Sequence, residues 1–239
     1  VHISSVRFTP DIDKAEVKAE LTISTPAPEG LVFRIEGKGN GLSFESGLNA
    51  GDSIASFRIP VSEMRLWSLD DPFLYEVTAS LSNGREADSV NTYFGMRKIS
   101  AMTIPGKDFK YVALNNQPLY LRLSLDQSYH PEGFYTFPSD AFMKDEIMRA
   151  KNLGLNGLRI HIKAEIPRKL YWADKYGLLI MEDIPNYWGE PDPESKANWE
   201  YIAEREILRD YNHPSIFSWV LFNETWGLFT NDSVAKRRS

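Results

Sequence analysis

The sequence predicts two domains, an immunoglobulin-like antiparallel β-sandwich followed by part of a TIM (β/α)8 barrel. As far as about Arg97, apolar residues alternate with polar ones, which is the period of half-buried strands. From Leu114 onward, apolar runs alternate with helix-like segments, as in parallel strands covered by helices. No glycine-rich phosphate loop is present, which favours a barrel over a nucleotide-binding sheet. We therefore expect the sandwich over residues 1–100 and the first half of a barrel, with strands one to four, over residues 101–239.

The composition is that of an ordinary globular protein. Of the 239 residues, 42% are apolar and 25% are charged, which excludes disorder, collagen and coiled coil. Because cysteine is absent, no disulfide or thiolate metal site can form, and we expect neither a metal nor a cofactor. The net charge of −6 argues against nucleic-acid binding. There is no membrane-length apolar run and no signal-peptide pattern. We expect a soluble protein, either cytoplasmic or, if a signal peptide lies upstream, periplasmic or secreted.

The strands of the first domain follow from the alternation. In residues 17–23, 31–36 and 75–81, every second side chain is apolar. Clusters of turn-forming residues separate these runs, and Asn83-Gly84 is the strongest short signal for a hairpin. Several short strands with regular turns in about 100 residues are typical of a β-sandwich.

The second half predicts four strands with three helices between them. The expected strands are the apolar runs at 119–125, 155–162, 178–184 and 216–222. Ser139 can cap the first helix, and Pro167 and Gly177 mark the ends of the second. The expected buried stripe of the first helix is Met143, Ile147 and Ala150. The third helix carries Trp199, Ala203 and Ile207 on one face, after a loop in which Glu190, Asp192 and Glu194 are expected to be solvated.

Polar side chains follow the ends of the expected parallel strands, where a barrel carries its functional groups. In chain order the candidates are Asp126, Gln127, Tyr129 and His130, then Arg159, His161 and Lys163, then Glu182 and Asp183, and finally Asn223, Glu224 and Trp226. Carboxylates, amides and an aromatic ring at one rim suit a carbohydrate. Sugar hydroxyls take paired polar partners, and the apolar face of a sugar ring stacks on Trp or Tyr.

Each candidate also has a purely structural interpretation. Glu224 could be an acid at a helix start, with Asn223 as the cap. Arg159 could pair with Glu182 or Asp183 instead of a ligand. An isolated histidine such as His161 is more often hydrogen-bonded scaffold than a catalytic group. Among the tryptophans, Trp226 is the best stacking candidate, whereas packing is expected for Trp188, Trp199 and Trp219.

Six stretches, in a consistent order, resemble the motifs of one family. The most specific is Asn212-His213-Pro214-Ser215-Ile216, which continues through Trp219 to Asn223-Glu224-Thr225-Trp226-Gly227. The others lie within residues 66–75, 93–99, 114–122, 153–159 and 173–179. Together they resemble glycoside hydrolase family 2 over nearly the whole chain, and the first stretch resembles the signature around that family's acid/base residue.

The resemblance implies a retaining β-glycosidase of β-galactosidase, β-glucuronidase or β-mannosidase type, which hydrolyses the O-glycosidic bond of a β-linked carbohydrate. Such enzymes place two carboxyl groups about 5–5.5 Å apart. By resemblance, Glu224 is the general acid/base, Asn223 holds the 2-hydroxyl of the sugar and Arg159 orients the carboxylates. Asp126, His161 and Trp226 are expected as further substrate contacts. The nucleophilic Glu is expected outside this chain, in a later barrel strand.

A half-barrel has an open sheet edge, so we also expect a homo-oligomer or completion by a partner. The isolated chain is expected to be inactive. Residues 123–128 depart from the Gly-Val-Asn-Arg-His-Glu common in the family, which leaves the sugar open. An alternative function is a non-catalytic, truncated carbohydrate-binding or assembly module, which the missing nucleophile supports. A nucleotide-dependent enzyme ranks last, because the sequence has no phosphate loop.

Overall fold

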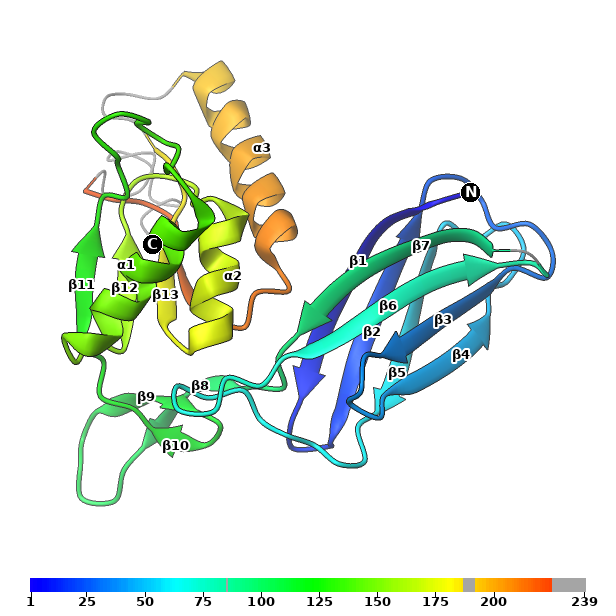
Figure 1. Ribbon diagram of the computed structural model, residues 1–239, viewed down its shortest axis with the longest axis horizontal. Coiled ribbons are helices and arrows are strands. Elements are labelled where there is room, and N and C mark those ends of the chain that lie inside the picture. Colours follow the sequence, from blue (N-terminus) through cyan, green and yellow to red (C-terminus); the bar gives the residue numbers. More distant parts are fainter. Residues whose placement is uncertain (85, 187–191, 225–239) are drawn as a thin grey trace. The chain divides into compact units, whose positions relative to one another are not determined.

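The computed structural model describes residues 1–84, 86–186 and 192–224. The chain divides into two compact units, Val1–Leu119 and Tyr120–Ser239. Each unit has its own hydrophobic core. Figure 1 shows the strands of the first unit and the mixed strands and helices of the second. Within the described ranges, no helix combines the length and the apolar content needed to cross a membrane.

The first unit contains two antiparallel sheets whose inward side chains form one core, as expected for a sandwich. One sheet has the order β1-β2-β5 and the other the order β4-β3-β6-β7. The strands are β1 (Ile3–Asp11), β2 (Glu16–Ile23), β3 (Val32–Gly37), β4 (Ser43–Gly47), β5 (Ile54–Pro60), β6 (Tyr75–Ser82) and β7 (Glu86–Phe94). The alternating residues of β2, from Val17 to Ile23, are buried as predicted. The hairpin predicted at Asn83-Gly84 is confirmed, because β6 pairs with β7 on either side of it.

A third, small sheet ends the first unit and was not predicted. It consists of β8 (Ile99–Thr103), β9 (Lys110–Leu114) and β10 (Gln117–Pro118), in the order β10-β9-β8. Asn115 and Asn116 connect β9 to β10 with φ angles of 52° and 62°. Asparagine tolerates this left-handed conformation, which a two-residue hairpin turn requires. Residues 114–118 therefore form a hairpin, not the start of the first parallel strand.

In its described residues, the second unit contains a four-stranded parallel sheet and three helices, in the chain order that the sequence predicts. The strands are β11 (Leu123–Asp126), β12 (Gly157–Ile160), β13 (Leu179–Asp183) and β14 (Ile216–Val220), and they lie in sequence order in the sheet. The helices are α1 (Asp140–Asn152), α2 (Pro167–Tyr176) and α3 (Pro193–Asp210). In the parallel register, Leu125 is opposite Arg159 and Arg159 is opposite Met181.

The structure tests the helix ends that were predicted from local sequence signals. The Ser139 hydroxyl accepts a hydrogen bond from the Phe142 backbone N–H at 3.1 Å and caps α1, as predicted. Gly177 ends α2 with a φ of 68°, also as predicted. Asp192 and Glu194 are exposed to solvent, as expected, but Glu194 lies in the first turn of α3 and not in a loop. The Asp192 carboxylate caps α3 by accepting from the Ser195 N–H at 2.7 Å, and the prediction for Glu190 falls outside the described residues.

The core of the second unit fixes which strand residues face away from the helices. Leu158, Ile160 and Ile180 pack in one cluster with residues of α1 and α2. Alternate residues of a strand point to opposite faces of its sheet. Arg159 and Asp183 therefore belong to the face opposite this core, at the C-terminal ends of their strands.

Candidate active site

Asp183 is the central anion of the candidate site. Its side chain is fully buried at the end of β13. The guanidinium of Arg159 binds it in a bidentate way, with Nε donating to Oδ1 at 2.9 Å and Nη2 donating to Oδ2 at 2.8 Å. The backbone N–H of Ile162 adds a third hydrogen bond, to Oδ2, at 3.2 Å. Of the two structural partners considered for Arg159, the structure therefore selects Asp183.

Arg159 also connects β12 to the end of the described chain. Its Nη2 donates a second hydrogen bond, to Asn223 Oδ1, at 2.9 Å. Asn186 holds the backbone of Asn223, accepting from its N–H and donating to its C=O, both at 3.3 Å. Asn223 is buried and fixed by both its side chain and its backbone. Since Oδ1 is bound by Arg159, Nδ2 is the group that the amide can offer to a ligand.

Glu224 follows Asn223 directly and is exposed to solvent. The pKa of Arg159 is raised, mainly by its hydrogen bonds to Asp183, and the negative charge of Glu224 acts on it in the same direction. The hydrogen bond from Arg159 thus reaches Asn223, the residue directly before Glu224, and the catalytic role of Glu224 stays a prediction. The stacking prediction for Trp226 falls outside the described residues.

Backbone strain is concentrated in the loops that follow the parallel strands. Ser128 follows β11, Ile162 follows β12 and Glu224 follows β14, with φ angles of 55°, 56° and 54°. Non-glycine residues rarely adopt this conformation, and it is least favourable for a β-branched residue such as Ile162. Such strain clusters at functional sites, where the surrounding contacts maintain it. The Asp183 carboxylate supplies one such contact to the Ile162 N–H.

Asp126 is engaged by a buried network. Its carboxylate lies 2.8 Å from the ammonium group of Lys169 and accepts from the Ser128 N–H at 2.7 Å. Lys169 is 1% exposed, and its ammonium group also donates to Ser128 Oγ at 2.9 Å. The same group lies 3.5 Å from the carboxylate of Glu165. This network holds the loop after β11. The role of Asp126 as a substrate contact stays a prediction.

Lys169 and Asn186 were not identified from the sequence. Lys169 lies one turn before the buried Ala173 of α2 and therefore on the same face of the helix. A lysine on an apolar helix face was the sequence signal that could have identified it. Asn186 follows the end of β13, where polar residues were expected, but it stands behind Pro185 and was not singled out. His161 is half-buried, and its Nδ1 is a buried atom with no hydrogen-bond partner within the described part of the chain. Its predicted substrate contact is not tested by this arrangement.

The residues Arg159, Asp183, Asn186 and Asn223 are called the Arg159 cluster below. Glu182 and Glu206 are buried carboxyl groups outside it. Glu182 Oε1 accepts from the Glu165 N–H at 2.9 Å. Glu182 Oε2 and both carboxyl oxygens of Glu206 have no hydrogen-bond partner in the residues that the structure describes. Burial, together with the nearby Asp210, raises the pKa of Glu182 to about 9. Burial raises the pKa of Glu206 to about 8. Both groups are therefore protonated in the folded protein at neutral pH.

We expect the free energy of unfolding to decrease as the pH rises from about 4.5 to about 9. When the chain unfolds, these carboxyl groups return to their ordinary pKa near 4.5, so ionisation favours the unfolded state. Glu206→Gln should remove the contribution of Glu206 to this decrease, which is on the order of a few kcal/mol since one pKa unit equals about 1.4 kcal/mol. Urea unfolding at pH 5, 7 and 9 measures this, with the exposed Glu204→Gln on the same helix as the control. An unchanged pH dependence in Glu206→Gln would contradict the assignment.

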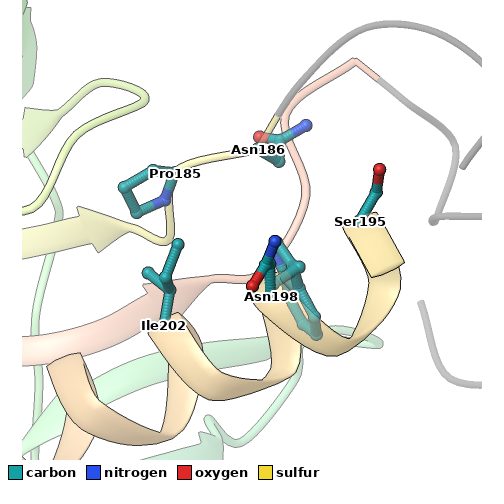
Figure 2. A pocket seen from close by; sticks show the side chains of 6 residues that line it. Pro185, Asn186, Ser195, Asn198 and Ile202 are labelled. Atoms are coloured by element: carbon teal, nitrogen blue, oxygen red, sulfur yellow. The ribbon is translucent and has the colours of Figure 1, made fainter. Parts of the chain in front are cut away.

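A pocket lies beside Asn186, between the segment after β13 and the first half of α3 (Figure 2). Its volume is about 270 Å³, and it is lined by Pro185, Asn186, Ser195, Asn198, Trp199 and Ile202. Trp199 stacks on Phe222 with ring centroids 4.7 Å apart, which fits the packing role expected for it. Because Asn186 also holds Asn223, the pocket and the Arg159 cluster share one residue.

Comparisons with known proteins agree on one family. Residues 1–97 match the family described as "Glycosyl hydrolases family 2". A β-galactosidase from Leuconostoc mesenteroides is 32% identical over 197 residues, which is 78% of this chain and 18% of the relative. A β-galactosidase from Thermoanaerobacterium thermosulfurigenes is 32% identical over 191 residues, which is 76% of this chain and 25% of the relative. The chain thus spans a quarter or less of the length of these curated relatives.

Solved structures with a similar fold include two glycosidases. A glycoside hydrolase family 2 β-galacturonidase from Eisenbergiella tayi, bound to galacturonate, has a TM-score of 0.76 and 26% identity. That match covers 93% of this chain and 41% of the other. A β-glucuronidase from Ruminococcus gnavus, in complex with D-glucuronic acid, has a TM-score of 0.78 and 19% identity. It covers 99% of this chain and 39% of the other, and at this identity it supports the fold alone.

Proposed function

Because the chain belongs to glycosyl hydrolase family 2, we propose that it carries the acid/base part of the active site of a retaining β-glycosidase. The observation that carries the proposal is the chain of contacts from Asp183 through Arg159 to Asn223. These contacts fix the residue before Glu224 at the C-terminal ends of parallel strands. In this proposal the sheet β11–β14 and its helices are half of a (β/α)8 barrel, the fold whose active sites lie at that end of the strands.

Glu224 acts in both steps of the proposed reaction. Its protonated carboxyl group donates a proton to the glycosidic oxygen while the bond from that oxygen to C1 breaks. A second carboxylate attacks C1 and forms a glycosyl ester. Glu224, now ionised, takes a proton from a water molecule. The water oxygen bonds to C1, the ester bond breaks, and the sugar and the second carboxylate are released. We place that second carboxylate outside these 239 residues, in the remainder of the longer protein that the relatives' length suggests.

Asn223 and Arg159 position the substrate and Glu224. Arg159 occupies Oδ1 of Asn223, so Nδ2 donates to the 2-hydroxyl of the sugar, a contact that strengthens in the transition state. Asp183 keeps Arg159 in place. His161, whose Nδ1 has no partner among the described residues, is a proposed further contact, as are Asp126 and Trp226.

The substrate is proposed to be a β-linked glycoside, either a neutral hexoside or a uronide. The relatives are named β-galactosidases, and one structural neighbour was solved with galacturonate. The test incubates the complete protein that contains this chain with p-nitrophenyl β-D-galactoside, β-D-glucuronide and β-D-galacturonide. Proton NMR then identifies the anomer released first. The β-anomer is expected, and an α-anomer would exclude the retaining mechanism. The isolated 239-residue chain should not turn over, and sustained hydrolysis by it would refute the placement of the nucleophile.

A further inference from the structure

We propose that Tyr129 and Tyr135 form a stacking platform for a sugar ring of an oligosaccharide substrate, beyond the sugar whose bond is cleaved. The inference rests on the proposed function for the class of ligand. It deepens that function by assigning the substrate as an oligosaccharide that extends across the rim. The evidence is the exposure, rigidity and location of the segment between β11 and α1.

The segment exposes aromatic rings within a short stretch of chain. Tyr129 is 51% exposed, Tyr135 is 56% exposed and Phe134 is 70% exposed. Single exposed apolar side chains are ordinary on protein surfaces, but clustered ones mark binding sites. A stable protein interface buries about 800 Å² per partner. Fully burying one aromatic side chain removes only about 150–250 Å². The cluster is therefore the size of a small-ligand site, not of a protein interface.

The two tyrosine rings are held together before any ligand arrives. Their centroids are 5.0 Å apart with an interplanar angle of 57°, and the two hydroxyls are hydrogen-bonded at 3.0 Å. The backbones of His130 and Phe134 exchange two hydrogen bonds of 2.9 Å, which closes the intervening loop. A preorganised pair loses little conformational entropy on binding, which favours a stacking role.

A buried lysine fixes this pair to the edge of the sheet. The Lys163 side chain is 4% exposed, and its ammonium group lies 5.8 Å from the Tyr129 ring centroid and 5.4 Å from that of Tyr135. The same ammonium group donates to the Ser128 C=O at 2.9 Å and lies 3.5 Å from Glu165. Burying a cation is costly unless it is paired, so these contacts hold Lys163 in one position. The tyrosine rings lie against a fixed charge.

The platform lies on the same rim as the Arg159 cluster. It follows the C-terminal end of β11, and Glu224 follows that of β14, three neighbouring strands away in a parallel sheet. With strands about 4.8 Å apart, β11 and β14 are separated by roughly 14 Å measured along the sheet. A group at that distance contacts a neighbouring sugar of a chain, not the bond being broken. Flat rings edged by hydroxyls match the apolar face and the hydroxyl rim of a sugar.

The test compares a double variant, Tyr129→Ala with Tyr135→Ala, against Tyr201→Ala in the complete protein. Tyr201 is a matched control because it is 58% exposed but lies on α3. The substrates are the p-nitrophenyl β-glycoside that the protein accepts and two β-1,4-linked tetrasaccharides, galactotetraose and cellotetraose. The double variant should lower kcat/KM about tenfold on the accepted tetrasaccharide, mainly through KM, and leave the aryl glycoside unchanged. Tyr129→Phe with Tyr135→Phe keeps both rings and should retain most of the activity.

Equal losses on both kinds of substrate would overturn the platform and indicate a structural role. A change of oligomeric state in the double variant, measured by analytical ultracentrifugation, would overturn it in favour of an interface between copies. If the complete protein hydrolyses no glycoside, the proposed function fails. The platform is then tested by binding, through calorimetric titration of the complete protein with each tetrasaccharide. Binding lost in the double variant supports it, and no binding to the unmodified protein overturns it.

Discussion

Glu224→Gln, in the complete protein that contains this chain, is expected to lower kcat by about 10²–10⁴-fold on glycosides with poor leaving groups. Glutamine keeps the shape of the side chain but cannot transfer a proton, so the departing oxygen leaves unprotonated. A dinitrophenyl glycoside needs no such protonation, and its first step should be affected far less. The difference is measured as kcat/KM, which reports the first step, on an alkyl and a dinitrophenyl glycoside of the same sugar.

The control for this variant is Glu200→Gln, which changes another exposed glutamate of the same unit. It should leave both rates unchanged. If Glu224→Gln reduced kcat/KM equally on both substrates, the role as proton donor would be wrong. An unchanged rate on both would remove Glu224 from the mechanism.

Asp183→Ala should reduce the free energy of unfolding by about 3 kcal/mol. Removing one partner of a buried ion pair costs about 3–5 kcal/mol because the other charge is left uncompensated. The lower end of this range applies here, since the Arg159 side chain is 29% exposed. The variant also leaves the Ile162 N–H without its acceptor and frees Arg159 from the position in which it holds Asn223. Urea unfolding of the chain measures the change.

The matched control is Asp145→Ala, which breaks the exposed pair with Arg149 on α1. Exposed pairs of this kind contribute about 0–1 kcal/mol. A similar small loss in Asp183→Ala would mean that the pair does not organise the site. A large loss in Asp145→Ala as well would show that the loss in Asp183→Ala is not specific to the buried pair.

Short-range signals predicted much of the fold. The alternation of β2, the Ser139 cap and the left-handed Gly177 all act within a few residues, and the structure confirms them. Local sequence signals were ambiguous at Asp192, because an acidic residue beside prolines fits both a loop and a helix cap. The small sheet β8–β10 was missed since it depends on two pairings, β8 with β9 across residues 104–109 and β9 with β10 across a turn of two asparagines.

The candidate site was predictable only as a set of positions. Strand ends identified Arg159, Asp183 and Asn223, because parallel strands bring their C-terminal ends to one edge. Which of them touch depends on register and on side-chain geometry, so the choice of Asp183 over Glu182 required the structure. Alternation places Glu182 on the opposite face from Asp183, where it is buried. Lys169 was missed because its partners come from three separate segments.

The most direct test of Glu224 as the acid/base is azide rescue of Glu224→Ala in the complete protein, with a dinitrophenyl glycoside as substrate. Without the carboxylate, water is not activated and the glycosyl ester accumulates. Azide is already an anion and needs no base, so it attacks C1, breaks the ester bond and restores turnover. We predict that azide accelerates the variant and that the product is the β-glycosyl azide. An α-glycosyl azide, or no acceleration at all, would contradict the assignment.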